Sequence, residues 1–474
     1  MSHPLISELC AVLGRRNVLW APSELEVYDC DALTVHRRRP AAVVFPQSTE
    51  QVAAVLKLCR RHGTAVVARG AGTGLAGGCT PDSGGAVVLA LTRLNKILEI
   101  DLRNSLALVE AGVTNLKLTQ AVQKAGFHFA PDPSSQNSAT IGGNAATNAG
   151  GPHTLKYGVT VNHVLGLEIV LADGSIVQLG PVENPIGPDL IGAIVGSEGT
   201  LAVITKLWVR LTPNPQAWRT LQATFASVED AVNAVSEIIA SGIIPAALEL
   251  MDAGILRAVD EAYHFGFPPD IAALLIVELD GMEVALDRQE RQAAEILGRH
   301  AALHVSRADS AAERELLWKC RKMAVGAVGR LSSSYLLEDG VVPRTQLAHM
   351  FRRTAEISRK FQVRIVNVAH AGDGNLHPIL LFDERDPAER ERVLAAGREI
   401  LLECIACGGS ITAEHGIGKE KLSLMSRLFV QNDLRVQERF RAAFDPLGTL
   451  NPGKLIPRSD GEGASCGISA AGGA

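Results

Sequence analysis

Two histidines bracket a short polar segment in the second half of the chain. The segment, "HAGDGNLHP", spans residues 370–378, and its glycines, Asp and Asn make it too flexible for a helix. The apolar runs "VRIVNVA" and "ILLF" on either side predict two strands joined by a short turn. His370 would then end one strand and His377 would begin its neighbour, so the two imidazoles would be close enough to share a ligand.

A second segment supplies a carboxylate and another imidazole. It reads "ITAEHGIG" at 411–418 and contains Glu414 and His415, whose side chains we expect to point in different directions because the residues are adjacent. Two imidazoles and a carboxylate suit Zn²⁺, Mn²⁺ or Fe²⁺ with positions left open for a substrate. A metal-dependent hydrolase is one interpretation of this cluster, although the sequence has no HExxH pair.

Three glycine-rich segments lie in the first half of the chain. They read "RGAGTGLAGG" (69–78), "PDPSSQNSATIGGNAATNAGG" (131–151) and "GSEGTLAVIT" (196–205). Consecutive glycines let backbone N–H groups approach an anion closely, and a run of small residues suits a backbone wrapped around an extended ligand. The first segment lacks the following helix and acidic residue of a Rossmann site. A hydrolase would leave all three segments without a role.

Composition and charge exclude several other classes of protein. The 474 residues carry a formal net charge of −5 with no long run of either sign, which argues against a nucleic-acid partner. Since no apolar run is long enough for a membrane span and no secretory signal is present, we expect a cytoplasmic protein, docked at most peripherally on the inner membrane through other subunits. Cys404 and Cys407 form a lone CxxC, which we interpret as core cysteines at a helix end.

Short strands and helices alternate along the chain. A strand–helix–strand unit at 41–70 has Ser48 as the expected N-cap of its helix, and Asp173-Gly174 predicts a hairpin within 165–180. A Pro-containing linker at 212–218 predicts the domain boundary. The remaining helix–strand rhythm up to residue 410 predicts a separate α+β unit.

These motifs together resemble a known family. With "DPLGTLNPGKLIP" at 445–457, they resemble the D-2-hydroxyacid dehydrogenase branch of the vanillyl-alcohol oxidase/p-cresol methylhydroxylase flavoproteins, and most closely the FAD subunits of bacterial glycolate oxidases. The resemblance covers about residues 20–457. It implies an α+β fold with a two-part FAD-binding domain and an α+β cap domain. The expected divisions are an N-terminal helical segment (1–37), the FAD-binding domain (38–214), the cap or substrate domain (215–410), a C-terminal return to the FAD domain (411–457) and a disordered tail (458–474).

The resemblance also assigns a set of residues to a non-covalent FAD. Thr73 follows Gly72 where some members of the superfamily carry a histidine that tethers the flavin, so no covalent bond is expected. The first loop would contact the pyrophosphate, the second would line the flavin, and the third would lie near the adenosine end or the ring. The residues implied are Arg69, Gly70, Ala71, Gly72, Thr73, Gly74, Pro131, Asp132, Ser135, Gly142, Gly143, Asn144, Asn148, Gly150, Glu198, Gly199, Ile204 and Asn451.

For the chemistry, the resemblance implies oxidation of a short D-2-hydroxy acid, glycolate or D-lactate, to the 2-oxo acid by hydride transfer to flavin N5. His370, His377 and Glu414 would bind a divalent metal and His415 would be the catalytic base. The other two implied site residues are Asn375, near substrate and flavin, and Arg321, on the substrate carboxylate.

Two further expectations concern specificity and the electron acceptor. Relatives that act on dicarboxylates carry a lysine where this chain has Leu336, Leu337 and Glu338, which favours a monocarboxylate over 2-hydroxyglutarate. Because the sequence shows no cluster or haem motif, electrons would pass to partner subunits that include an iron–sulfur protein, or to a quinone or cytochrome. A non-catalytic flavoprotein scaffold is a further alternative, and the intact Glu414 and His415 argue against it.

Overall fold

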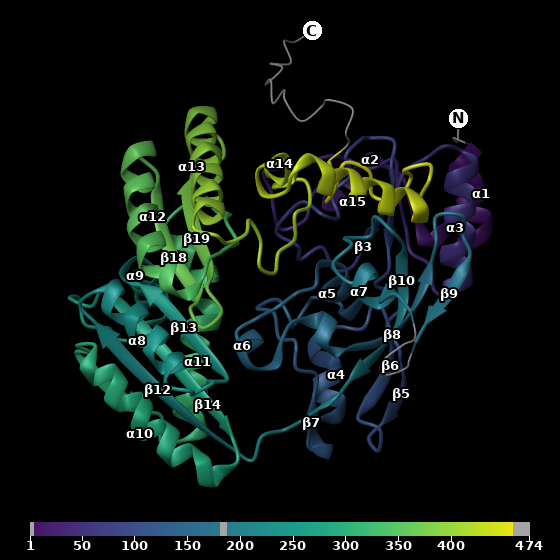
Figure 1. Cartoon of the computed structure of the whole chain (residues 1–474). Helices are drawn as coiled ribbons and strands as arrows, with labels where there is room; N and C mark the ends of the chain where they lie inside the picture. The colour runs from purple at the N-terminus through teal and green to yellow at the C-terminus, as the bar shows by residue number, and fades with distance from the viewer. Residues whose placement is uncertain (1–3, 181–186, 458–474) are drawn as a thin grey trace.

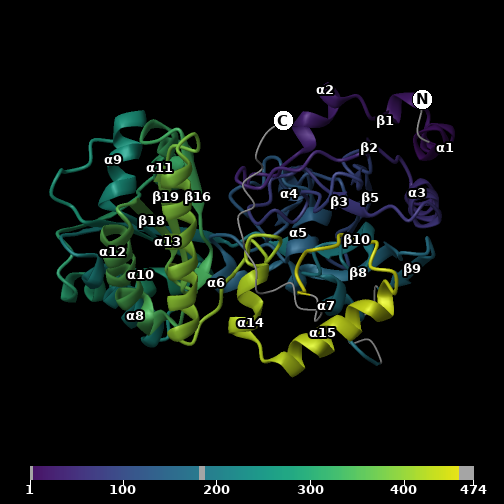
Figure 2. The same ribbon diagram turned by 90° about the horizontal axis from the view of Figure 1, so that it is seen from above.

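Two lobes lie side by side in the computed structural model, which describes residues 4–180 and 187–457 (Figures 1 and 2). The N-terminal lobe contains residues 4–180, 187–213 and 425–457, and the cap lobe contains residues 217–410. The predicted disordered tail at 458–474 lies outside the described residues. None of the described helices is long and apolar enough to cross a membrane.

A four-stranded sheet opens the N-terminal lobe. Its strands, in sheet order, are β1 (Val18–Leu19), β2 (Ala42–Val44), β4 (Val87–Ala90) and β3 (Val66–Arg69), of which the last three are parallel. The helix between β2 and β3, α3 (Thr49–Arg61), begins as predicted at Ser48, whose hydroxyl accepts a hydrogen bond from the Gln51 N–H at 3.3 Å. It packs against α1 (Pro4–Leu13). β3 leads directly into the first glycine loop.

A second, antiparallel sheet completes this lobe. Its strands, in sheet order, are β5 (Ile97–Asp101), β6 (Leu106–Glu110), β10 (Val203–Arg210), β8 (Val164–Val170) and β9 (Ile176–Leu179). The predicted hairpin at Asp173-Gly174 joins β8 to β9. Packed against this sheet are α4 (Asn115–Val122), α5 (Ile141–Thr147) and α7 (Leu190–Ile194). The short helix α2 (Pro22–Leu25) packs on the four-stranded sheet instead, and α6 (Thr154–Tyr157) packs against the core of the cap lobe through Leu155.

The predicted linker at 212–218 is largely structured. Thr212–Pro213 is strand β11, paired with β7 (Phe127–His128), and β12 begins at Ala217. Only residues 214–216 separate these strands, so the chain crosses between the lobes in a short step.

An antiparallel sheet of eight strands forms the cap lobe. Its strands are β15 (His304–Arg307), β12 (Ala217–Phe225), β14 (Ala273–Gly281), β13 (Ala247–Asp252), β18 (Arg364–His370), β19 (Asn375–Phe382) and β16 (Ser334–Leu337), with β17 (Gly340–Val341) also paired to β19. One face packs on α8 (Val228–Ala240), α10 (Glu283–Arg299), α12 (Leu347–Phe361) and α13 (Pro387–Ala406). The other packs on α9 (Ala253–Tyr263) and α11 (Ala311–Ala327). The helices on both faces explain why β14 is almost continuously apolar and buried.

The chain then returns to the N-terminal lobe. Helices α14 (Met425–Leu428) and α15 (Gln431–Phe444), yellow in Figures 1 and 2, lie against that lobe. Beyond them Leu450 forms a parallel bridge with Val66 of β3, and the Asn451 N–H donates to the Val66 carbonyl at 2.8 Å. The segment that joins the cap lobe to α14 begins with residues 411–418, which we call the connecting segment.

Candidate active site

A cavity of about 310 Å³ opens between the two lobes. All three glycine-rich segments line it from the N-terminal lobe. The predicted cofactor residues in the lining are Arg69, Gly70, Ala71, Gly72, Thr73, Gly74, Ser135, Gly142, Gly143, Asn144, Glu198, Gly199 and Ile204. Arg321 and His377 line it from the cap lobe, and Glu414 and His415 from the connecting segment.

Glycine is required in this wall because neighbouring chain passes very close. A Cβ on Gly142 would lie 2.5 Å from the Ala111 Cβ and 2.8 Å from its carbonyl oxygen, and a Cβ on Gly70 would meet the Thr140 hydroxyl. That hydroxyl caps α5 by accepting the Gly143 N–H at 3.2 Å. The wall is therefore mostly main chain and small side chains, which suits a long, flat ligand with phosphate groups such as FAD.

Arg69 anchors the N-terminal segment to the first glycine loop. Its guanidinium donates to the Cys30 carbonyl at 2.8 Å and to the Cys79 sulfur at 3.3 Å. Asp31, the next residue after Cys30, is buried in the same corner and lines the cavity, and burial raises its pKa to about 6. Sequence reasoning missed Asp31 and Cys79 because neither belongs to a recognisable motif.

The other predicted cofactor residues lie behind the lining and support it. The Pro131 carbonyl accepts from Asn115 at 2.8 Å, and Asn148 accepts the Val161 N–H at 2.9 Å. Asn451 donates to the carbonyls of Gly78 and Glu198 at 2.8 and 2.7 Å, tying the C-terminal return to two loops of the wall. A Cβ on Gly150 would lie 3.0 Å from a Glu414 oxygen, and Asp132 holds His153.

One carboxylate oxygen is the meeting point of three imidazoles. Glu414 Oε1 lies 3.2 Å from His377 Nε2, 3.5 Å from His370 Nε2 and 3.8 Å from His415 Nε2. The two strands that bracket the "HAGDGNLHP" turn, β18 and β19, place the first two histidines beside each other as predicted. The expectation that Glu414 and His415 diverge is wrong, because the connecting segment is not a regular strand and both side chains line the cavity.

The second nitrogen of each paired histidine is already engaged. His370 Nδ1 lies 2.7 Å from Glu249 Oε1, and His377 Nδ1 lies 3.3 Å from the Glu338 carbonyl oxygen. These contacts fix the ring orientations and leave both Nε2 atoms facing Glu414, an arrangement typical of histidines that bind a metal. Imidazole and carboxylate are donor types that suit a divalent cation such as Zn²⁺, Mn²⁺ or Fe²⁺. The described group at this site whose ligand atoms all lie within 4.8 Å of one another, however, consists of Asp339, His377, Glu414 and His415, without His370.

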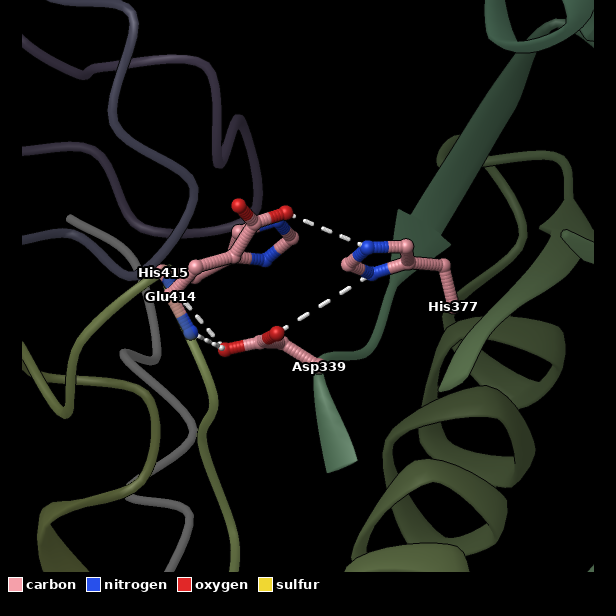
Figure 3. A group of neighbouring side chains, drawn as sticks. All are labelled: Asp339, His377, Glu414 and His415. Atoms are coloured by element: carbon pink, nitrogen blue, oxygen red, sulfur yellow. Dashed lines mark hydrogen bonds and ion pairs between the residues drawn. The ribbon is translucent and has the colours of Figure 1, made fainter. Parts of the chain in front are cut away.

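Asp339, which sequence reasoning missed, organises the connecting segment. Its Oδ2 accepts the N–H groups of residues 413–415 at 2.8–3.1 Å and the Thr412 hydroxyl at 2.6 Å. Donor atoms of Asp339, His377, Glu414 and His415 all lie within 4.8 Å of one another (Figure 3). Its only sequence signal was its place at the end of the "SYLLED" strand.

A buried ion pair holds Arg321 at the cavity. The Arg321 Nε donates to Glu249 Oε2 at 2.6 Å, while the other oxygen of Glu249 contacts His370. Glu249 is fully buried, and it was missed because it lies within an apolar strand. Asn375 is buried at the start of β19, and its Oδ1 has no hydrogen-bond partner among the described residues.

The electrostatics of this cluster follow from burial and pairing. Although burial raises it, hydrogen bonds to His370 and His377 hold the pKa of Glu414 well below its usual range. Burial opposes charge on His370, but Glu249 and Glu414 raise its pKa well above the usual value. Burial lowers the pKa of His415 to about 4, so its imidazole is neutral at neutral pH.

A second network joins the lobes beside the cavity. Glu278 of β14, fully buried, accepts two hydrogen bonds from Arg314 at 2.8 and 2.6 Å and one from the Trp318 Nε1 at 2.5 Å. His153 of the N-terminal lobe reaches the same carboxylate at 3.3 Å, stacks on Trp318, and binds Asp132 through its Nδ1 at 2.7 Å. Arg314 and Trp318 lie on the same helix as Arg321, so this network helps to fix α11.

Comparison with known proteins identifies the family. Residues 40–180 match the FAD binding domain, and residues 214–455 match the C-terminal domain of FAD linked oxidases. The chain is 45% identical over 442 residues to the glycolate oxidase subunit GlcD of Escherichia coli (strain K12), covering 93% of this chain and 88% of that protein. It is 32% identical to a D-lactate dehydrogenase of Anaerostipes hadrus, covering 95% and 97%.

The fold is that of p-cresol methylhydroxylase with substrate bound, at a TM-score of 0.81 and 20% identity over 95% of this chain and 96% of that one. The expected α+β fold, with an FAD-binding domain of this type and a cap, is confirmed. The interpretation as a metal-dependent hydrolase is set aside, because it gave no role to the domain that binds FAD. The chain belongs to the FAD-linked oxidase family, with FAD as its cofactor, and is a homologue of the glycolate oxidase subunit GlcD.

Proposed function

We propose that the protein oxidises glycolate or D-lactate to the 2-oxo acid with FAD as the electron acceptor. The observation that carries this proposal is the convergence of His370, His377 and Glu414 with His415 and Arg321 around the cavity that the glycine loops line. The names of the E. coli and A. hadrus relatives, a glycolate oxidase subunit and a D-lactate dehydrogenase, support the substrate class.

Arg321 is the group that would bind the substrate carboxylate. Its Nε is held by Glu249, which leaves the two terminal nitrogens of the planar guanidinium for a carboxylate. The other cap-lobe residues in the lining, apart from His377, are Val325, Tyr335, Leu337 and Val368. This apolar surround suits the hydrogen or methyl group of a short monocarboxylate better than the second carboxylate of 2-hydroxyglutarate, the alternative substrate.

His415 is the group that would accept the hydroxyl proton. Its imidazole is neutral, and its Nδ1 is buried without a hydrogen-bond partner among the described residues. Asp339 fixes the backbone of this residue through the His415 N–H at 2.8 Å. A neutral imidazole has a nitrogen lone pair free to accept the proton, but because its pKa is about 4 the transfer would also require the pKa of the substrate hydroxyl to be lowered.

Two bound groups would complete the site. When bound, a divalent metal on His370, His377 and Glu414 would supply a Lewis acid for the substrate hydroxyl, and FAD supplies the two-electron acceptor. Glu249 contributes by orienting both His370 and Arg321. One carboxylate would thus hold a residue that binds the metal and the residue that binds the substrate carboxylate. Asn375 would lie near the substrate from the first residue of β19.

The reduced flavin must pass its electrons on. The E. coli relative is named as a subunit of glycolate oxidase, which supports companion subunits for this chain as well. We propose that the acceptor is such a subunit, an iron–sulfur protein, with a quinone or cytochrome as the alternative, and that the protein works in the cytoplasm or peripherally at the inner membrane.

An anaerobic absorbance titration tests this proposal. The purified flavoprotein is titrated with glycolate, each lactate enantiomer and D-2-hydroxyglutarate, before and after treatment with a chelator. We expect glycolate or D-lactate to bleach the flavin band, and chelation to abolish the bleaching. Bleaching that survives chelation would contradict the metal's role, and bleaching by D-2-hydroxyglutarate alone would contradict the substrate. If none of the acids reduces the flavin, the result would favour the alternative interpretation, a non-catalytic flavoprotein scaffold.

A further inference from the structure

The connecting segment, residues 411–418, is held from both lobes by buried carboxylates. From the cap lobe, Asp339 accepts the backbone N–H groups of residues 413–415. From the N-terminal lobe, Glu198 accepts the Ile417 N–H on one oxygen and the Gly418 N–H on the other, each at 2.7 Å. Five of the eight residues in the segment therefore donate their backbone N–H to a carboxylate.

Glu198 is itself firmly placed. It is only 7% exposed, its backbone has a φ of 51°, and its carbonyl oxygen accepts from Asn451 at 2.7 Å. A non-glycine residue in this left-handed region costs free energy and persists where its surroundings demand it. The loop that carries Glu198 is thus fixed by the C-terminal return before it reaches the connecting segment.

The sequence "HGIG" fits this carboxylate closely. Gly416 has a φ of 87°, and a Cβ there would lie 2.6 Å from a Glu198 oxygen. Gly418 has a φ of 50°, and a Cβ there would collide with the Ala76 carbonyl. Successive N–H groups turned toward one anion form a binding concavity, and here the anion is a side chain of the same chain. The approach of Glu198 therefore explains Gly416, and the approach of the Ala76 carbonyl explains Gly418.

We propose that Glu198 is a positioning residue for the reaction rather than a ligand of the flavin. The pair of carboxylates, Glu198 and Asp339, suspends the connecting segment between the lobes and so sets the positions of Glu414 and His415 relative to the flavin cavity. This inference rests on the proposed function, because it assigns those two residues to metal binding and proton transfer. Burial raises the pKa of Glu198 to about 7, while the hydrogen bonds from the Ile417 and Gly418 N–H groups act in the opposite direction and favour the ionised carboxylate.

The variant Glu198→Gln tests the clamp with little change in shape. Its amide nitrogen must face one of the two N–H groups, so one hydrogen bond is lost and a donor opposes a donor. We expect kcat for glycolate or D-lactate to fall about 10- to 100-fold, while KM and the Kd for FAD stay within about threefold. Hydrogen exchange of the Ile417 and Gly418 amides should become at least about tenfold faster.

The matched control is Glu110→Gln. Glu110 is equally buried, at 7% exposure, and its carboxylate accepts the Lys96 N–H at 2.8 Å in the antiparallel sheet of the same lobe. This variant should leave kcat and the exchange of residues 417 and 418 unchanged. A drop in kcat equal to that of Glu198→Gln would mean that any lost buried carboxylate in the lobe has this effect, and would overturn the assignment.

Other outcomes would overturn the proposal in different ways. The Glu198→Gln variant could bind FAD more than about tenfold more weakly, yet keep its kcat when saturated with FAD. That result would indicate that Glu198 is a flavin ligand. Unchanged kcat and unchanged exchange would remove any positioning role. If the variant does not fold, exchange in the unmodified flavoprotein decides, because fast exchange at Ile417 and Gly418 is incompatible with the clamp. The exchange and FAD-binding measurements need no substrate, so they remain decisive even if none of the proposed acids is oxidised.

Discussion

The two walls of the cavity are built by opposite means. The wall from the N-terminal lobe consists of main chain and small residues, and its glycines sit where a Cβ would collide with neighbouring chain, as at Gly142. The wall from the cap lobe carries side chains whose charges are paired behind the surface, with Glu249 between Arg321 and His370 as the central example. In the proposed function, the first wall would present backbone to the cofactor and the second would present charge to the substrate.

This difference determines how each wall responds to change. A wall of main chain has little room for added atoms, but replacing one of its glycines with alanine changes no charge. A wall of buried ion pairs tolerates changes of shape better than the loss of one partner, because the partner left behind is a buried, uncompensated charge. Substitutions in the two walls should therefore have effects of different size and on different properties.

The largest effect is expected for Glu249→Gln. This change leaves Arg321 and His370 without their shared carboxylate, so the unfolding free energy should fall by about 3–5 kcal/mol. The value of kcat/KM for glycolate or D-lactate should fall about 100-fold or more. Arg321, which would bind the substrate carboxylate, and His370, which would bind the metal, would both lose their orientation. Urea unfolding of the FAD-loaded protein and steady-state kinetics measure the two effects.

A surface pair provides the control for this substitution. Asp287 lies 2.9 Å from Arg219 on the outside of the cap lobe, and its side chain is 62% exposed. Asp287→Asn should cost no more than about 1 kcal/mol and leave kcat/KM unchanged. Equal losses of stability in Glu249→Gln and Asp287→Asn would contradict the role given to the buried pairs.

An intermediate effect is expected for Gly142→Ala in the opposite wall. The added Cβ would press on the Ala111 side chain and carbonyl, and neither can move away easily. Overpacking of this kind costs about 1–3 kcal/mol, which should appear as weaker FAD binding with little change in kcat once FAD is saturating. Gly85→Ala, with open space around the added Cβ, is the control and should bind FAD normally. A lowered kcat with normal FAD affinity would contradict the predicted difference between the two walls.

The smallest effect concerns the network at the edge of both walls. Burial would lower the pKa of His153, but Asp132 and Glu278 raise it to about 10. Because the folded-state pKa lies above the usual value near 6.5, the stabilisation is full below pH ~6.5 and is lost as the pH rises toward about 10. By linkage a pKa rise of this size is worth at most about 5 kcal/mol. Because the His153 side chain is 22% exposed and solvent screens its charge, the variant His153→Gln should be less stable than the parent by roughly 1–2 kcal/mol at pH ~6, and this difference should shrink toward pH ~10.

Thermal or urea unfolding at several pH values follows this difference. His62→Gln is the control, since His62 pairs with Glu8 at 3.0 Å near the surface and should contribute no more than about 1 kcal/mol. A difference for His153→Gln that grows with pH would mean that the network does not hold a charged imidazole.

Features encoded by neighbouring residues could be predicted from the sequence. The turn between His370 and His377, the hairpin at Asp173-Gly174 and the cap at Ser48 each depend on a few adjacent residues, and the structure has all three. The glycine-rich segments could also be found from the sequence, because their composition is unusual. Their exact contacts with FAD stay predictions, and so do the domain boundaries, since neither follows from local pattern alone.

Residues that acquire their role through distant pairing could not be predicted. Glu249 lies in the apolar strand β13, and only the antiparallel register of that strand with β18 sets it directly opposite His370. Asp339 looks like a strand end until the connecting segment wraps around it. Glu414 and His415 were expected to diverge because adjacency on a regular strand was assumed, whereas the backbone there is shaped by two carboxylates from elsewhere.

The bridge between Leu450 and Val66 has a consequence for how the protein is made. The parallel sheet that carries the first glycine loop gains its last backbone partner from a segment at the far end of the chain, and Asn451 then secures two loops of the flavin wall. During synthesis the residues of the cap lobe, 217–410, are therefore complete before these contacts can form. We expect a chain that ends before Leu450 to bind FAD more weakly, because two loops of the cavity wall would lose their hydrogen bonds to Asn451.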